Sequence, residues 1–129
     1  MSLADDIAVT PLIAVYGTLK KGLNNAYLLE GAEFVGADTS RVLTLYDVGP
    51  YPGAKQRESK GIALEVYRID EAMLARLDVL EDHRLDAPGE GEYQRVTLTT
   101  RFGQAWVYLY NPDIVDLIAI DEGGWPLPR

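Results

Sequence analysis

The segment IAVYGTLKKG, residues 13–22, joins a short apolar run to a loop bounded by glycines. Its first four residues, Ile13–Tyr16, predict a buried strand, because a continuous apolar run has no solvated face. Gly17–Gly22 then predicts a compact loop with several backbone N–H groups outside regular structure. Such a loop can bind an anion or a carboxylate, although an ordinary connection between elements explains the same composition.

This loop does not fit nucleotide binding. Gly17 and Gly22 have the spacing of a phosphate-binding P-loop. However, Leu23 and Asn24 stand where that motif requires Lys followed by Ser or Thr. We therefore exclude a P-loop.

The composition excludes several further chemistries. The chain has 129 residues, 47% of them apolar, which predicts one domain over residues 1–129. It has no cysteine, so thiol nucleophiles, disulfides and cysteine-bound metals are excluded, and its single histidine argues against a Ser-His-Asp triad. The net charge of −8, from 20 acidic and 12 basic residues, argues against nucleic acid or an anionic membrane as partner.

The chain shows no sign of export or of a membrane span. Met1–Asp6 carries two acids and no basic stretch, so it does not read as a secretory signal. No apolar run approaches the roughly 18 residues that would cross a bilayer. We expect a soluble, cytoplasmic protein.

Periodicity predicts more strand than helix. Because strands outnumber helices and several neighbours look antiparallel, the pattern favours an α+β fold over a doubly wound α/β fold. One or two helical turns are expected over Asn24–Leu29, and Ile114–Ile120 is ambiguous between strand and helix. Strands are expected over Arg41–Tyr46, Gly61–Ile69, Tyr93–Thr100 and Gln104–Tyr110, the last two as a hairpin.

The clearest helix is predicted from Glu71 to about Asp82, with Asp70 as its N-cap. Glu81 follows Leu74 by seven positions, about 20° short of two full turns, so it shares the apolar face of this helix. That face is formed by Met73, Leu74, Leu77 and Leu80.

A carboxylate on an apolar helix face has two explanations. Glu81 either ends the helix in water or is held in a pocket, where desolvation raises its pKa and suits it to general acid and base chemistry. Periodicity alone favours the first, because most glutamates at helix ends are structural.

Several segments together resemble the gamma-glutamylcyclotransferase-like family. They lie in the order and spacing of that family over about residues 12–110, and the chain is most similar to the gamma-glutamylamine cyclotransferase branch. The segments are VYGTLKKG (15–22), YPGA (51–54), GIALEVY (61–67), LDVLE (77–81), YQR (93–95) and AWVY (105–108).

The resemblance implies a small, mixed, barrel-like sheet with flanking helices around a pocket. Active members of the family convert a gamma-glutamyl compound to 5-oxoproline and a free amine, without a cofactor or a metal. The family's acid/base glutamate maps onto Glu81, and Tyr93 is a weaker candidate for lining the pocket. Its binding loop maps onto Tyr16, Gly17, Thr18 and Leu19.

A chain without cysteine could catalyse this reaction, because the protein does not have to supply the nucleophile. The α-amino group of the substrate attacks the γ-carbonyl of the same molecule, so the substrate supplies the nucleophile. One carboxylate can take a proton from that amine and return it to the leaving amine. Backbone N–H groups near Gly17–Leu19 could bind either the oxyanion or the α-carboxylate.

The sequence leaves two alternatives to cyclotransferase activity. The first is an idle pocket protein that binds a small acidic or amine-bearing metabolite, although such a protein has no chemical need for Glu81. The second, hydrolysis by an activated serine, is poor because Ser2, Ser40 and Ser59 lack a G-x-S-x-G setting.

Several other polar and aromatic residues have structural explanations. Arg95 is, like Tyr93, a weaker candidate for the site, and pairing with a surface acid explains it equally well. Thr18 could contribute its hydroxyl to the site, and a turn hydrogen bond is the structural alternative. His83 is expected at a solvated helix end, because Glu81, Asp82 and His83 point in different directions and cannot readily converge on one metal. The aromatic row of Trp106, Tyr108 and Tyr110 is expected to pack within a sheet.

Overall fold

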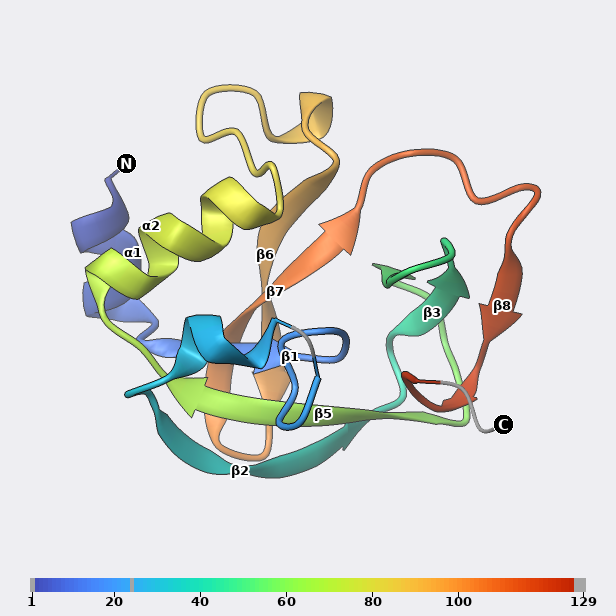
Figure 1. Cartoon of the computed structure of the whole chain (residues 1–129), viewed down its shortest axis with the longest axis horizontal. Coiled ribbons are helices and arrows are strands. Elements are labelled where there is room, and N and C mark those ends of the chain that lie inside the picture. The colour runs from blue at the N-terminus through green and yellow to red at the C-terminus, as the bar shows by residue number, and fades with distance from the viewer. Residues whose placement is uncertain (1, 24, 127–129) are drawn as a thin grey trace.

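The computed structural model describes residues 2–23 and 25–126, and Figure 1 shows their arrangement. The helices are α1 (Leu3–Val9), η1 (Ala26–Leu29), α2 (Glu71–Leu80) and η2 (Pro88–Glu90), of which η1 and η2 are 3-10 helices. The strands are β1 (Leu12–Val15), β2 (Glu33–Ser40), β3 (Thr44–Asp47), β4 (Pro52–Lys55), β5 (Gly61–Arg68), β6 (Tyr93–Thr100), β7 (Gly103–Tyr110), β8 (Ile118–Ile120) and β9 (Glu122–Gly123).

Strand β1 lies inside the larger sheet, whose order is β2-β5-β1-β7-β6 with β9 added beside β5. It pairs antiparallel with β5 and parallel with β7. All four of its residues are buried, as the continuous apolar run predicts. A second sheet has the order β4-β3-β8. The predicted mixed α+β fold with flanking helices is therefore confirmed, with its strands divided between two sheets.

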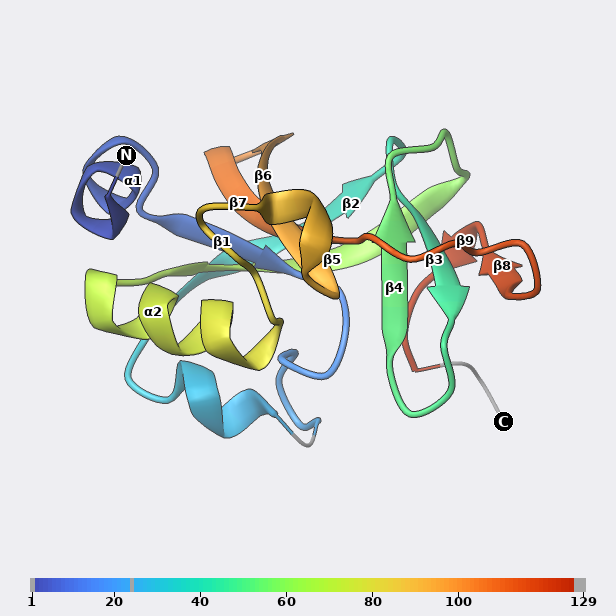
Figure 2. The ribbon, with the colours of Figure 1, turned by 90° about the horizontal axis from the view of Figure 1, so that it is seen from above.

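The side chains on the two faces of β1 belong to two different core clusters. Leu12 and Ala14 pack with the smaller sheet, whereas Ile13 and Val15 pack with Leu74 and Leu77 of α2. Strand alternation explains this division, because successive side chains point to opposite faces. In Figures 1 and 2, α1, η1 and α2 gather at one end of the molecule and the smaller sheet lies at the other.

Helix α2 begins where the sequence predicts and ends slightly earlier. The Asp70 carboxylate accepts a hydrogen bond from the Met73 N–H at 2.8 Å, which confirms the N-cap. The helix ends at Leu80, with Glu81 as C-cap, because Asp82 adopts a left-handed backbone with φ of 53°. The Asp82 and His83 N–H groups return to the carbonyls of Val79 and Asp78, which is the Schellman arrangement.

The other predicted elements agree in type and shift at their ends. The hairpin of β6 and β7 runs from Tyr93 to Tyr110, and β5 is shorter than Gly61–Ile69 by one residue. Strand β3 occupies only the end of Arg41–Tyr46, and β8 only the last three residues of Ile114–Ile120. The helical turn expected from Asn24 begins at Ala26 in η1, and residue 24 lies outside the described residues.

Three elements have weak signals in the sequence. Helix α1 is short and is capped by Ser2, whose hydroxyl accepts the Asp5 N–H. Strand β2 is an edge strand with mostly exposed or half-buried residues, so it shows no clean alternation of apolar and polar side chains. Strand β4 opens with Pro52 and Gly53, which normally indicate a turn. Strand β2 forms because it pairs with β5, and β4 forms because it pairs with β3.

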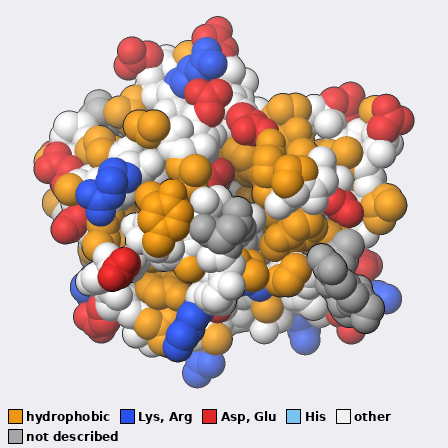
Figure 3. All heavy atoms as spheres, in the orientation of Figure 1, with side chains coloured by type: hydrophobic (Ala, Val, Ile, Leu, Met, Phe, Trp, Pro, Cys, Tyr) orange, Lys and Arg blue, Asp and Glu red, His pale blue; other side chains and the backbone are white. Residues whose placement is uncertain are grey.

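Acidic side chains are dispersed over the face drawn in Figure 3, and they do not form a single patch. The excess of acids is therefore mostly a solvated surface on this face, as expected for a net charge of −8. No helix among residues 2–23 and 25–126 is long and apolar enough to cross a membrane.

Candidate functional site

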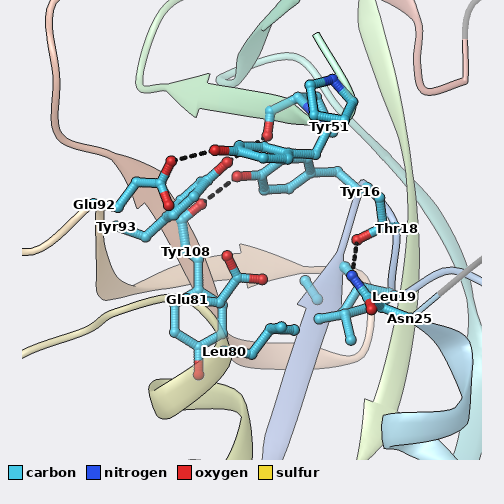
Figure 4. A pocket seen from close by; sticks show the side chains of 15 residues that line it. Tyr16, Thr18, Leu19, Asn25, Tyr51, Leu80, Glu81, Glu92, Tyr93 and Tyr108 are labelled. Atoms are coloured by element: carbon cyan, nitrogen blue, oxygen red, sulfur yellow. Dashed lines mark hydrogen bonds between the residues drawn. The ribbon is translucent and has the colours of Figure 1, made fainter. Parts of the chain in front are cut away.

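A cavity of about 240 Å³ lies beyond the end of β1. This volume is below the range of about 300–1,000 Å³ typical of drug-sized ligands, which favours a small metabolite. Its walls come from segments that are far apart in the chain (Figure 4). The lining residues are Ala14, Val15, Tyr16, Gly17, Thr18, Leu19, Asn25, Pro50, Tyr51, Pro52, Leu80, Glu81, Glu92, Tyr93 and Tyr108.

Glu81 supplies one of the two carboxyl groups among the described residues that line this cavity. It follows the last residue of α2, and its carboxyl group points into the space enclosed by Tyr16, Tyr93 and Leu80 (Figure 4). Burial, with a smaller contribution from the negative charge of Glu92, raises the pKa of Glu81 to about 7. The carboxyl group can therefore both accept and donate a proton near neutral pH.

The loop from Asp82 to Glu92 brings the second carboxylate into the cavity. The Asp82 carboxylate accepts the Glu92 N–H at 3.1 Å, and the Glu81 carbonyl accepts the Tyr93 N–H at 3.2 Å. Gly91 packs so closely on the Asp82 carbonyl that a Cβ at position 91 would collide with it. The return of the chain onto the end of α2 therefore depends on glycine at this position.

The predicted binding loop forms the opposite wall. Lys20 closes a turn by donating its N–H to the Gly17 carbonyl at 3.0 Å, and Leu19 is buried under α2. The Thr18 hydroxyl accepts a hydrogen bond from the Asn25 amide at 2.8 Å, as a turn-bracing role predicts. Within the described ranges, the N–H groups of Gly17, Thr18 and Leu19 donate to no other residue.

Gly17 also explains part of the YPGA segment. A Cβ at position 17 would lie 3.0 Å from the Pro52 ring, so the loop packs directly on β4. At Gly53 a Cβ would lie 2.5 Å from the Tyr110 ring, so only glycine lets this aromatic ring lie over the strand. The two glycines therefore bring the smaller sheet against the loop and β7.

Buried tyrosines form much of the remaining wall. The Tyr16 hydroxyl donates to the Tyr108 carbonyl, and the Tyr93 hydroxyl donates to the Pro52 carbonyl, each at 2.6 Å. Burial raises the pKa of Tyr16 and the pKa of Tyr93 well above the ordinary value. Both side chains are therefore neutral near pH 7, and their oxygens remain available as acceptors.

The structure brings together most of the residues that the sequence singled out for the site, but Arg95 is not among the described residues that line it. Tyr16, Gly17, Thr18, Leu19, Glu81 and Tyr93 line one cavity. Four further lining residues with polar side chains were not predicted to lie there: Asn25, Tyr51, Glu92 and Tyr108. Tyr51 belongs to the YPGA segment and Tyr108 to the aromatic row, so each carried a sequence signal, whereas Glu92 lies among other acids and carried none.

The interpretation of Arg95 as a partner for a surface acid is wrong. Its side chain is 2% exposed and donates two hydrogen bonds to the Asp78 carboxylate, at 2.8 and 3.0 Å. A third donor reaches Asp6 of α1 at 3.2 Å, and the Tyr108 hydroxyl donates to Asp78 at 2.6 Å. Burial makes the pairing necessary, because an isolated charge in the core is costly.

His83 is also held more firmly than a solvated helix end requires. Its Nδ1 atom accepts the Arg95 backbone N–H at 3.1 Å, and the ring is half-buried. Burial, acting more strongly than the charge of Asp78, lowers the pKa of His83. Among the described residues, no group of three or more acidic or histidine side chains could hold a metal ion.

The cavity combines a carboxyl group that titrates near neutrality with backbone N–H groups that have no acceptor among the described residues. Such a combination in a small cavity is typical of enzymes that act on small metabolites. Residues 13–127 match the family described as gamma-glutamyl cyclotransferase, AIG2-like. The chain belongs to this family, which confirms the resemblance found in its sequence.

Individual relatives agree with this assignment. A provisionally named gamma-glutamylcyclotransferase of Vibrio cholerae is 39% identical over 115 residues, which span 88% of this chain and 94% of the relative. The gamma-glutamylcyclotransferase family protein YtfP of Escherichia coli is 36% identical, with coverages of 88% and 94%. The crystal structure of an AIG2-like protein from Mus musculus matches with a TM-score of 0.69 and 27% identity, and covers 86% of each chain.

Proposed function

We propose that the protein converts a gamma-glutamylamine or a gamma-glutamyl amino acid to 5-oxoproline and a free amine. The observation that carries this proposal is the position of Glu81, whose carboxyl group faces the cavity opposite the Tyr16–Leu19 loop and has a pKa of about 7. Membership of the gamma-glutamyl cyclotransferase family supports the same reaction.

In the proposed reaction Glu81 acts as general base and then as general acid. Its carboxylate removes a proton from the α-ammonium group, and the freed nitrogen attacks the γ-carbonyl carbon. A carbon–nitrogen bond forms within the substrate and closes a five-membered ring. Glu81 then gives the proton to the original amide nitrogen, and the bond from that nitrogen to the carbonyl carbon breaks as the oxyanion reforms the carbonyl. The ring nitrogen gives up its second proton through Glu81 to the released amine, which leaves as an ammonium ion. No water is consumed.

The loop and the tyrosines complete this proposal. The N–H groups of Gly17, Thr18 and Leu19 are donors for the anionic groups of the substrate, either its carboxylate or the developing oxyanion. Tyr93 contributes an aromatic wall and a hydroxyl oxygen that can accept a hydrogen bond. Enclosure in a small cavity keeps the substrate folded for ring closure, which supplies a high effective concentration.

The test is 5-oxoproline release from a panel of gamma-glutamyl amines, gamma-glutamyl amino acids and glutathione. We expect Glu81→Gln to lower turnover at least about 100-fold, because glutamine cannot transfer the proton. Glu90→Gln removes the same charge from exposed η2, outside the cavity, and is expected to retain activity. Full turnover by Glu81→Gln would refute the role of Glu81.

The same panel separates this proposal from a pocket protein without activity. Such a protein would bind a small acidic or amine-bearing metabolite and release no 5-oxoproline from any member of the panel. Binding without turnover in the unaltered protein would therefore favour that alternative.

A further inference from the structure

The described residues that line the cavity include negative charge and no basic side chain. Two of them are glutamates, and none is lysine, arginine or histidine. The proposed reaction uses Glu81 for proton transfer and the Gly17–Leu19 loop for the anionic groups of the substrate. The carboxylate of Glu92 is therefore left without a function, although it lies in the wall of the same cavity.

Glu92 is held in place from both its backbone and its side chain. Its N–H donates to Asp82, and its carboxylate accepts a hydrogen bond from the Tyr51 hydroxyl at 2.5 Å. This bond raises the pKa of Tyr51 to about 12, so the phenol remains a neutral donor. Among the described residues, no lysine or arginine forms a salt bridge with Glu92.

The position of Glu92 relative to Glu81 indicates which part of a substrate it would contact. In Figure 4, Glu92 lies on one side of the Glu81 carboxyl group, and Thr18, Leu19 and Asn25 lie on the other. A gamma-glutamyl group that places its anionic groups on the loop would react beside Glu81. The bond that breaks would then release an amine toward Glu92.

We propose that Glu92 selects the leaving amine by charge, in an inference that rests on the proposed function. A second, cationic group on the leaving amine would pair with the Glu92 carboxylate. A leaving group that carries a carboxylate, as a gamma-glutamyl amino acid does, would meet a like charge instead. The substrate class is thus a gamma-glutamyl conjugate of an amine with a distal ammonium group.

Three conjugates of nearly equal length test this inference. The γ-carbonyl of glutamate is joined to 1,4-diaminobutane, to butylamine or to 4-aminobutyrate, so the far end is an ammonium, a methyl or a carboxylate group. We expect kcat/KM for 5-oxoproline release to fall in that order. In Glu92→Gln, which can still accept the Tyr51 hydrogen bond, the preference for the ammonium over the methyl end is expected to shrink about tenfold.

The ratio between conjugates is the decisive measurement. Glu92 also acts on the pKa of Glu81, so the substitution changes all three rates, and this common factor cancels in the ratio. Glu90→Gln, the matched control, should keep the ratio of the unaltered protein. An unchanged ratio in Glu92→Gln would overturn the inference and leave the proposed function intact. Absence of 5-oxoproline from these conjugates and from every member of the panel described above would refute the proposed function itself.

Discussion

Glu81 shows how a single residue acquires its properties from its surroundings. Its position on the apolar face of α2 follows from the sequence. The pKa near 7 arises first from burial in a cavity that Tyr16 and Tyr93 also line, and then from the negative charge of Glu92. The same desolvation that suits the group to proton transfer also disfavours its charged form in the folded protein.

This cost predicts how stability depends on pH. The pKa of Glu81 is about 7 in the folded protein, whereas an unfolded chain releases the proton near the ordinary value of 4.5. Stability from this group is therefore complete below about pH 4.5 and is lost as pH rises through 7, by up to about 3 kcal/mol. In urea unfolding we expect Glu81→Gln to gain stability relative to the unaltered protein between pH 4.5 and 8. Parallel pH curves for the two proteins would contradict this expectation.

At the scale of elements, the site depends on how α2 ends and how the chain returns to β6. The left-handed Asp82 stops the helix and its carboxylate holds the Glu92 N–H. Gly91 allows the returning chain to lie against the Asp82 carbonyl. These contacts place two carboxylates, eleven positions apart in sequence, in one cavity.

Replacement of Gly91 by alanine tests this connection. Its backbone, with φ of −81°, suits any residue, so the main obstacle to alanine is the close contact with the Asp82 carbonyl. We expect Gly91→Ala to lower the free energy of unfolding by about 1–3 kcal/mol, because the loop must move. For the same reason we expect the rate of 5-oxoproline release to fall more than about tenfold. Gly89→Ala, where a Cβ meets nothing within 4 Å, is the matched control. Equal behaviour of the two variants would show that the close contact is unimportant.

At the scale of the whole molecule, a buried ion network joins the N-terminal helix α1 to α2, β6 and β7. Arg95 of β6 binds Asp78 of α2 and Asp6 of α1, and Tyr108 of β7 donates to Asp78. The Arg95 guanidinium also lies 4.5 Å from the centre of the Trp106 ring. The network fixes α1 and α2 to the sheet. Tyr108 connects it to the site, because this residue both donates to Asp78 and lines the cavity.

Arg95→Met is expected to destabilise the fold strongly, because it leaves the carboxylates of Asp6 and Asp78 buried without their cation. We expect a loss of about 3–5 kcal/mol in urea unfolding at pH 7. The exposed pair of Arg68 and Glu33 gives the comparison, since Arg68→Met removes an ion pair in which both side chains are more than half exposed. That variant should lose less than about 1 kcal/mol. Similar losses in both variants would contradict a special role for the buried network.

What the sequence determined by itself is local. An apolar run followed by Gly17 defined β1 and its loop, the Asp70 cap and apolar spacing defined α2, and the period of seven placed Glu81 on the apolar face. These features depend on residues within a few positions of one another, so backbone propensity and side-chain direction are sufficient to predict them.

Only the tertiary structure decided which distant residues meet. Glu92, Tyr51 and Tyr108 reach the cavity through sheet pairing and a returning loop, and Arg95 is buried because α1 and α2 supply its two carboxylates. Burial and the pKa of Glu81 follow from the same long-range packing. The physical reason is that desolvation depends on what covers a group, and the covering residues lie far away in the chain.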